Sequence, residues 1–160
     1  MEIEKRLEAM GLALPEPMQA PSGMRLPFAN VRVWGDRAYI AGHVAQNPDG
    51  TLAAPQGKVG GAVTVEQGYA SARLTALSIL GSLKRELGDL DRVVGWLRVL
   101  GMVNVAPGFN TTPNVVNGFS DLILELYGEA AGRHARSAVG MAVLPFEMPV
   151  EIEAEVAIRE

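Results

Sequence analysis

The sequence predicts an α+β fold in which two amphipathic helices cover one face of a single sheet. Two observations predict it: β-rich segments pair off at both ends of the chain, and two long helical patterns enclose a fifth β-rich run. The expected order is ββ-α-β-α-ββ, preceded by one short helix. The expected segments are 30–34, 37–41, 64–87, 93–105, 113–128, 135–143 and 150–158.

Composition sets the class of protein before any motif is considered. The chain has 160 residues, of which 48% are hydrophobic, and this suits one folded domain. It has no cysteine, which excludes a disulfide scaffold, a cysteine nucleophile and a thiolate metal site. Its two histidines are too few for most zinc sites. The net charge of −4 argues against non-specific binding of nucleic acid.

The N-terminal segment predicts a short helix followed by an irregular arm. Ile3, Leu7 and Met10 recur on one side of a helix over residues 2–12, and the prolines of 15–27 prevent regular structure. We therefore expect residues 1–25 to form a helix and arm attached to one domain, 26–160. Acidic residues at the start and the lack of a long apolar stretch predict a cytoplasmic protein without a membrane span.

Turn-forming residues predict the first hairpin and the long loop after it. Alternating residues 30–34 and 37–41 are joined by Gly35-Asp36, which is typical of a tight hairpin turn. Residues 42–61 are rich in Gly, Pro, Asn and Asp, so they predict a loop. Loops of that length in a small domain are often functional.

Both long helices carry end signals. Thr64 and Gln67 have the spacing of a capping box, and Gly88 ends that helix. Gly81 in its middle indicates close packing against another backbone. The second helix begins at Pro113, with Thr112 as the expected N-cap, and Gly128 ends it.

The run over residues 93–105 is apolar at both strand parities. Leu97, Val99 and Val103 share one parity, whereas Trp96, Leu100 and Met102 share the other. Two helices cover only one face of a sheet, so the other face needs a different cover. Association between copies of the chain through the open face is the simplest answer.

Four features could carry chemistry, and each also has a plain structural interpretation. Arg136 begins a strand of small and apolar residues; it is either a carboxylate anchor or a solvated strand end. The Glu151, Glu153 and Glu155 row is either a solvated face or the source of one buried acid–base carboxyl. Asn117 faces a cleft or solvent. His43 has no catalytic partner placed by any motif, so no catalytic triad is expected.

Several segments together resemble the RidA/YjgF family, also labelled endoribonuclease L-PSP. The strongest is the Arg136-Ser137 strand with its Leu144-Pro145 turn and the Val-Glu-Ile-Glu-Ala strand from Val150. Asn117 aligns with the Asn of the family's second helix, and the N-terminal extension resembles that of a longer subgroup. The matching segments are 28–42, 47–50, 88–94, 135–145 and 149–154.

This resemblance implies a chorismate-mutase-like fold that assembles as a homotrimer, with clefts for small carboxylic acids at the subunit interfaces. It implies hydrolysis of reactive enamine or imine intermediates, such as 2-aminoacrylate, to 2-oxo acids and ammonia. No metal or cofactor is implied. By position, Arg136 would pair with the substrate carboxylate, and Glu151 would position the attacking water or relay a proton. Asn117, Phe28, Ala138 and Gly42 would line the same cleft.

Three departures leave the activity open. Phe28, Ala41 and Ala138 stand where the family usually has Tyr, Ser, and Cys or Ser, so the expected pocket is more apolar. That favours, as an alternative, a protein that binds 2-oxo acids without catalysis. A ribonuclease role, suggested by the family's label, is opposed by the acidic balance and the lack of a basic, aromatic-rich surface.

Overall fold

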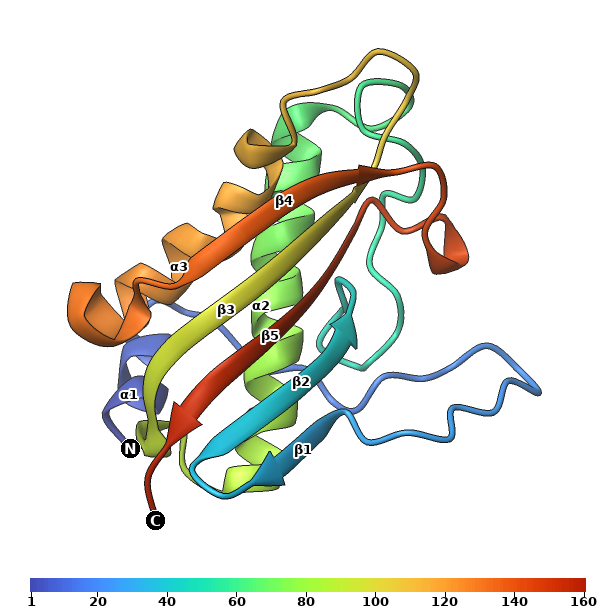
Figure 1. Ribbon diagram of the computed structural model, residues 1–160. Coiled ribbons are helices and arrows are strands. Elements are labelled where there is room, and N and C mark those ends of the chain that lie inside the picture. The colour runs from blue at the N-terminus through green and yellow to red at the C-terminus, as the bar shows by residue number, and fades with distance from the viewer.

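A five-stranded mixed sheet with helices on one face forms the body of the molecule (Figure 1). The computed structural model describes all residues, 1–160. The predicted α+β class and element order are confirmed. The elements are α1 (Glu2–Ala9), β1 (Val31–Trp34), β2 (Arg37–His43), α2 (Val65–Leu87), the 3-10 turn η1 (Leu90–Arg92), β3 (Val93–Asn104), α3 (Thr112–Gly132), β4 (Ala135–Met141), the 3-10 turn η2 (Pro145–Glu147) and β5 (Val150–Ile158).

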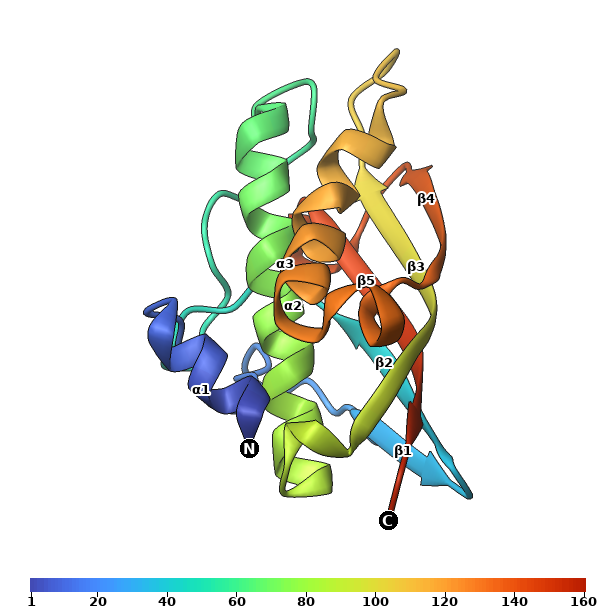
Figure 2. The same ribbon diagram turned by 90° about the vertical axis from the view of Figure 1, so that its left-hand side faces the viewer.

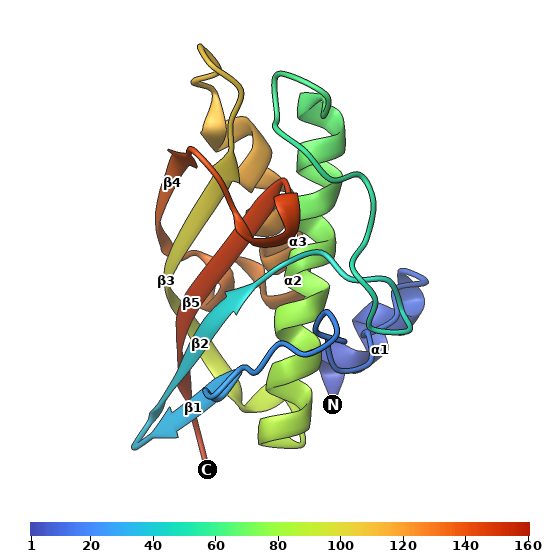
Figure 3. The same cartoon turned by 90° about the vertical axis from the view of Figure 1, so that its right-hand side faces the viewer.

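The strands lie in the order β1-β2-β5-β3-β4. Only β3 and β4 pair in parallel, because α3 connects them and returns the chain to the same end of the sheet. All other neighbours are antiparallel. Figures 2 and 3 show the two layers edge-on, with α2 and α3 against one face and nothing on the other.

Strand β3 carries an irregularity that the sequence pattern does not reveal. Its register with β5 shifts between Trp96 and Arg98, so Leu97 is an extra residue. Trp96 consequently lies on the helix side, where its ring makes edge contacts with Phe119 and Tyr127, each with 5.7 Å between ring centroids. The prediction that Trp96 shares a face with Leu100 and Met102 is wrong for this reason.

The open face of the sheet is mixed rather than apolar. On β3 it presents Arg98 beside Leu100 and Met102, while the paired positions of β5 are the three alternating glutamates. The apolar positions of β5 between them are all buried against the helices, as predicted. The open face of β3 is thus only partly apolar, with charge along the neighbouring strand.

Helix α2 has the ends that its sequence predicts. The Thr64 hydroxyl accepts from the Gln67 amide at 3.1 Å and the Gln67 side chain accepts from the Thr64 amide at 2.9 Å, which completes the capping box. Gly88 adopts the left-handed conformation at the other end. A Cβ on Gly81 would lie 3.2 Å from the carbonyl oxygen of Pro15, so the expected close backbone is that of the N-terminal arm.

Helix α3 begins differently from the prediction and extends past its predicted end. Its N-cap is Thr111, because the hydroxyl of Thr112 is turned to the sheet and donates to the carbonyl of Ala138 at 2.9 Å. At Gly128 the backbone is non-helical, with φ of 71°, so the first helical segment ends there as predicted; a second short helical segment then continues to Gly132.

The terminal elements are shorter than expected. Helix α1 ends at Ala9, and Met10 is 37% exposed, although Ile3 and Leu7 join the main core as predicted. Residues 15–27 hold no helix or strand, as expected of the arm. Strand β4 ends at Met141 instead of residue 143.

The closest contact between the two long helices predicts a stability effect. A Cβ on Gly118 of α3 would lie 2.0 Å from the carbonyl oxygen of Tyr69 in α2, so Gly118→Ala forces the helices apart. We expect a loss of about 1–3 kcal/mol or more in the free energy of unfolding, measured by urea denaturation. Gly95→Ala is the matched control, since its Cβ meets nothing closer than 3.8 Å; equal losses in the two variants would contradict the packing argument.

Candidate functional site

Arg136 lies on the edge strand β4, on the side of the sheet that faces α3. Its register partner on β3 is Val99, which is fully buried beneath the helices. One terminal nitrogen, Nη1, donates to Asn117 Oδ1 at 2.9 Å and to Ser120 Oγ at 3.0 Å. The other, Nη2, makes only a long contact of 3.4 Å with the carbonyl of Pro113. The predicted pair Arg136 and Asn117 is therefore in direct contact.

The guanidinium of Arg136 has no carboxylate partner. It forms none of the salt bridges of the structure, and its contacts are all with neutral oxygens. A guanidinium has five N–H donors, and both on Nη1 are used. The Nε–H and the Nη2 hydrogens leave one edge for a planar anion. Burial lowers the pKa of Arg136, an effect that Asp121 opposes.

Ala138 lies two residues farther along β4, on the same side as Arg136. It is half-buried and pairs with Gly101, whose missing side chain leaves room for Val116 of α3. Its carbonyl holds Thr112 at the start of α3, as described above. We refer to Arg136, Asn117 and Ala138 as the Arg136 cluster.

Glu151 lies on the opposite, open face of the sheet. It pairs with Met102 of β3, and its carboxylate packs over Gly42 of β2; a Cβ on Gly42 would lie 2.9 Å from Glu151 Oε2. The register of β2 with β5 shifts between Ile40 and His43, so a bulge brings Gly42 against this carboxylate. Burial raises the pKa of Glu151, and the nearby Glu153 raises it further.

Phe28 lies close to the same bulge. It and Gly42 line one small hollow of about 30 Å³ between the arm, β2 and α2. Phe28 is 57% exposed, so most of it is available to another surface. We refer to Glu151, Gly42 and Phe28 as the Glu151 cluster.

A single chain does not bring the two clusters together. The Arg136 cluster belongs to the edge formed by β4 and α3, whereas the Glu151 cluster belongs to β5, β2 and the segment before β1. Strand β3 separates the strands that carry Arg136 and Glu151, and the two side chains point to opposite faces. The chain therefore holds two incomplete groups of the residues expected at one site.

His43 is buried at the end of β2, 7% exposed, which supports its structural interpretation. Its Nδ1 lies 2.6 Å from the carbonyl oxygen of Ala41 and its Nε2 lies 2.8 Å from Ser82 Oγ. A similar contact joins His134 Nε2 to Ser120 Oγ at 2.8 Å. Sequence reasoning missed Ser82 and Ser120, since serines within helices carry no spacing signal that links them to a distant histidine.

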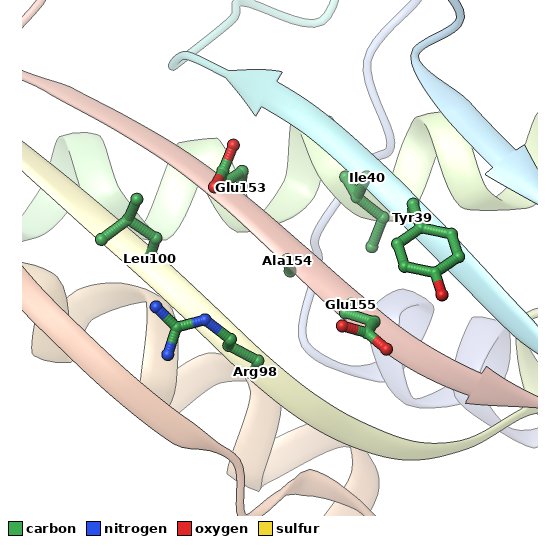
Figure 4. A pocket seen from close by; sticks show the side chains of 7 residues that line it. All are labelled: Tyr39, Ile40, Arg98, Leu100, Glu153, Ala154 and Glu155. Carbon is green, nitrogen blue, oxygen red and sulfur yellow. The ribbon is translucent and has the colours of Figure 1, made fainter.

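The open face also holds a hollow of about 230 Å³, which contains none of the predicted catalytic or binding residues (Figure 4). Tyr39, Glu155 and Arg98 lie around it, with Glu153 and Leu100 toward its other end. Glu155 accepts from Arg37 at 2.6 Å, so that member of the glutamate row is paired at the surface.

One group of carboxylates has the arrangement of a cation site. Glu4, Asp89 and Asp91 lie together where α1 meets η1. Asp91 already accepts from the Met1 ammonium, and Glu4 pairs with Lys84 at 2.9 Å. These contacts account for the group as an anchor for α1.

The buried His43 predicts a pH-dependent stability. Burial, together with the nearby Arg85, lowers the pKa of His43 from its ordinary value of 6.5. The unfolded chain therefore binds this proton more readily, so the free energy of unfolding is highest above about pH 6.5 and falls on acidification toward the folded-state pKa. Urea denaturation at several pH values should show a weaker pH dependence for His43→Gln, and parallel curves for the two proteins would contradict this assignment.

The match to a family model covers nearly the whole chain. Residues 4–152 match the family described as "YjgF/chorismate_mutase-like, putative endoribonuclease". "Protein TCP17" of Trypanosoma cruzi is 36% identical over 157 residues, which are 98% of this chain and 94% of that protein.

No helix of the structure has both the length and the apolar character needed to cross a membrane.

Solved structures agree with the family model. The protein Atu1372 of Agrobacterium tumefaciens, of unknown function, is 37% identical with a TM-score of 0.86, covering 98% of this chain and 92% of that one. A structure described as a "putative endoribonuclease" from Shewanella oneidensis is 32% identical with a TM-score of 0.87, covering 99% and 100%. The chain therefore belongs to the YjgF/chorismate-mutase-like family, which confirms the resemblance to RidA/YjgF proteins seen in its sequence.

Proposed function

We propose that the protein hydrolyses small, carboxylate-bearing enamine or imine intermediates to 2-oxo acids and ammonia. The observation that carries this proposal is the half-buried guanidinium of Arg136, oriented by neutral oxygens and unpaired with any carboxylate. A charge held in this way keeps its attraction for an anionic ligand, and its free edge matches a carboxylate in geometry.

The chemistry needs few groups besides this anchor. An imine carbon is already electrophilic, so water adds to it to give a carbinolamine, and that intermediate expels ammonia as its C=O bond forms. Glu151 has the properties of the proton-transfer group, because burial raises the pKa of its carboxyl toward neutral pH. It would move one proton from the attacking water to the imine nitrogen, and then the hydroxyl proton of the carbinolamine to the departing amine, which leaves as ammonia. An enamine first becomes the imine by gaining a proton on carbon and losing one from nitrogen. No metal or cofactor enters these steps.

The two clusters would form one site only between subunits. In a ring built from heterologous contacts, the β4 edge of one copy meets a different surface of the next, so unlike patches face each other at every interface. A homotrimer of this kind would bring the Arg136 cluster of one copy to the Glu151 cluster of its neighbour. The unpartnered sheet face and the exposed Phe28 supply surface for that contact.

A structural neighbour supports a ligand of this size. One solved structure of this fold is described as Escherichia coli TdcF with bound serine, a small molecule that carries a carboxylate and an amine. The pair are 20% identical with a TM-score of 0.59, covering 92% of this chain and 99% of that one, so the likeness is one of fold. In the present chain, Phe28, Ala41 and Ala138 favour substrates whose side chains are apolar.

The same apolar exchanges favour a second candidate, the binding of 2-oxo acids without catalysis. That function needs the Arg136 cluster but not the proton transfer by Glu151. The family description also names an endoribonuclease. Against this stands the net charge of −4.

The anchor predicts the outcome of an assay for ammonia. An amino-acid oxidase generates imino acids in situ, and the added protein should accelerate release of ammonia. We expect Arg136→Ala to lower kcat/KM at least about 100-fold, because a buried charged contact to the substrate is lost. Arg136→Lys keeps the charge without the bidentate geometry and should fall between the two.

The outcomes of this assay separate the candidate functions. No acceleration by the wild-type protein with any imino acid would overturn the deaminase proposal. A rise in melting temperature with 2-oxo acids would then favour binding alone. Cleavage of RNA that survives Arg136→Ala would support the ribonuclease role.

A site shared between subunits predicts that two inactive variants recover activity when they are assembled together. In trimers reassembled from equal amounts of Arg136→Ala and Glu151→Gln, random placement leaves about one site in four with both residues intact. We expect about a quarter of the wild-type rate after mixed refolding, and none from either variant refolded alone. If each site lay within one chain, every site would carry a substitution and no activity would return.

A further inference from the structure

His134 and Ser120 form a continuous hydrogen-bonded chain behind Arg136. His134 precedes β4, and its Nδ1 lies 2.8 Å from the carbonyl oxygen of Gly132. Its Nε2 lies 2.8 Å from Ser120 Oγ, and that oxygen also receives Nη1 of Arg136 at 3.0 Å. The chain thus runs from backbone to imidazole to hydroxyl to guanidinium.

The direction of each hydrogen bond follows from the chemistry of its two ends. The carbonyl of Gly132 can only accept, so His134 carries a proton on Nδ1. In the neutral ring Nε2 is then an acceptor, and the Ser120 hydroxyl donates to it. The lone pairs of Ser120 Oγ are left to accept from Arg136, whose guanidinium can only donate. With a neutral imidazole, only one placement of the hydrogens gives every group in this hydrogen-bond network a partner.

We propose that Ser120 and His134 are positioning residues that orient Arg136 so that its free edge receives the carboxylate of the ligand. This inference rests on the carboxylate site of the proposed function. Asn117 and Ser120 together take both hydrogens of Nη1, so the guanidinium cannot rotate without breaking one of these bonds. His134 in turn fixes the hydroxyl of Ser120 with its oxygen toward Arg136.

The surroundings of His134 keep its ring neutral. The ring is half-buried and packs edge-on against Phe119, with 5.9 Å between the centroids. Burial lowers the pKa of His134 below its ordinary value; the hydrogen bond to the Gly132 carbonyl opposes this effect, and the charge of Arg136 adds to it. Of the other charged groups on the adjoining elements, Asp121 on α3 acts on Arg136, and Arg133 forms an exposed ion pair with Glu129. A neutral imidazole therefore remains available as the acceptor at pH 7.

The other histidine of the protein, His43, lies in the same kind of hydrogen-bond network. His43 Nδ1 faces the carbonyl of Ala41, two residues earlier, just as His134 faces Gly132. Its Nε2 meets Ser82 Oγ, which accepts from Nη2 of Arg85 at 3.2 Å. His43 is therefore an internal reference: a histidine in an equivalent network that does not include Arg136.

Binding of pyruvate, used as a simple 2-oxo acid, tests the inference by calorimetry on the full chain. We expect Ser120→Ala to weaken binding by about 5–10-fold, the size of one ordinary lost hydrogen bond, because Ser120 acts through Arg136 and does not touch the ligand itself. Ser120→Thr keeps the hydroxyl and should bind within about twofold of wild type. Ser78→Ala is the matched control, since it removes a buried helix hydroxyl that bonds only to the carbonyl of Leu74.

The ring nitrogens give a readout that a merely structural role would not move. In a long-range proton–nitrogen NMR spectrum we expect both histidines as the Nδ1–H tautomer. Pyruvate should shift the Nε2 resonance of His134 in the wild-type protein and not in Ser120→Ala. The substitution itself should leave the resonances of His43 unchanged. An Nε2–H tautomer for His134 would overturn the inference.

The binding data distinguish failure of the positioning role of Ser120 from failure of the proposed carboxylate site. Loss of pyruvate binding in Arg136→Ala, with wild-type affinity in Ser120→Ala, overturns the positioning role alone. Absence of binding by the wild-type protein, or equal binding by Arg136→Ala, overturns the carboxylate site and the inference together. In the deaminase assay, Ser120→Ala should raise KM more than it lowers kcat, because the anchor contact exists in both the ground state and the transition state.

Discussion

The parallel pairing of β3 with β4 determines most of the architecture and the position of the anchor. Two parallel neighbours need a crossover, and α3 supplies it on the same face that α2 covers. That crossover leaves β4 at the edge of the sheet with α3 directly above it. A long polar side chain on the inner side of β4 can then meet the polar residues of α3 without entering the core. Arg136 lies in this position, between strand and helix at the border of the core.

The partners of Arg136 differ in kind from those of Arg37, which lies on the same sheet. Arg37 is paired with Glu155 across the open face, so its charge is largely compensated. Arg136 instead meets an amide, a hydroxyl and a backbone carbonyl. Neutral acceptors restrain a guanidinium without cancelling its charge, and partial burial strengthens that charge's interactions. Within this sheet Arg37 is therefore ion-paired, whereas the charge of Arg136 is not compensated by a carboxylate.

Periodic and local signals made most of the fold predictable, and the exceptions have physical causes. The capping box of Thr64, the glycine at Gly88 and the alternation of β5 each act over a few residues, so the sequence shows them directly. The predicted face of Trp96 is wrong because one bulge residue reverses the strand parity, and no local sequence signal marks that bulge. The prediction of Thr112 as the N-cap is wrong because its hydroxyl bonds to Ala138, 26 residues later, and no local signal shows that contact. Arg136 and Asn117 could be named as partners only through resemblance, and Ser120 with His134 not at all, because their contacts join separate elements.

The separation of Arg136 from Glu151 has a consequence for how the proposed activity is controlled. Under the proposed function, a single chain would supply the anchor for the carboxylate, whereas Glu151 lies on the other face of the sheet and beyond a further strand. Under the proposed function, binding needs one surface of the chain, whereas turnover needs two surfaces from different copies. Under this proposal, assembly would do more than cover the exposed sheet: it would place the Glu151 carboxyl, whose pKa burial raises, beside an imine held by Arg136. Activity would therefore follow the concentration of the assembled form, while the affinity for a 2-oxo acid would depend first on the network behind Arg136.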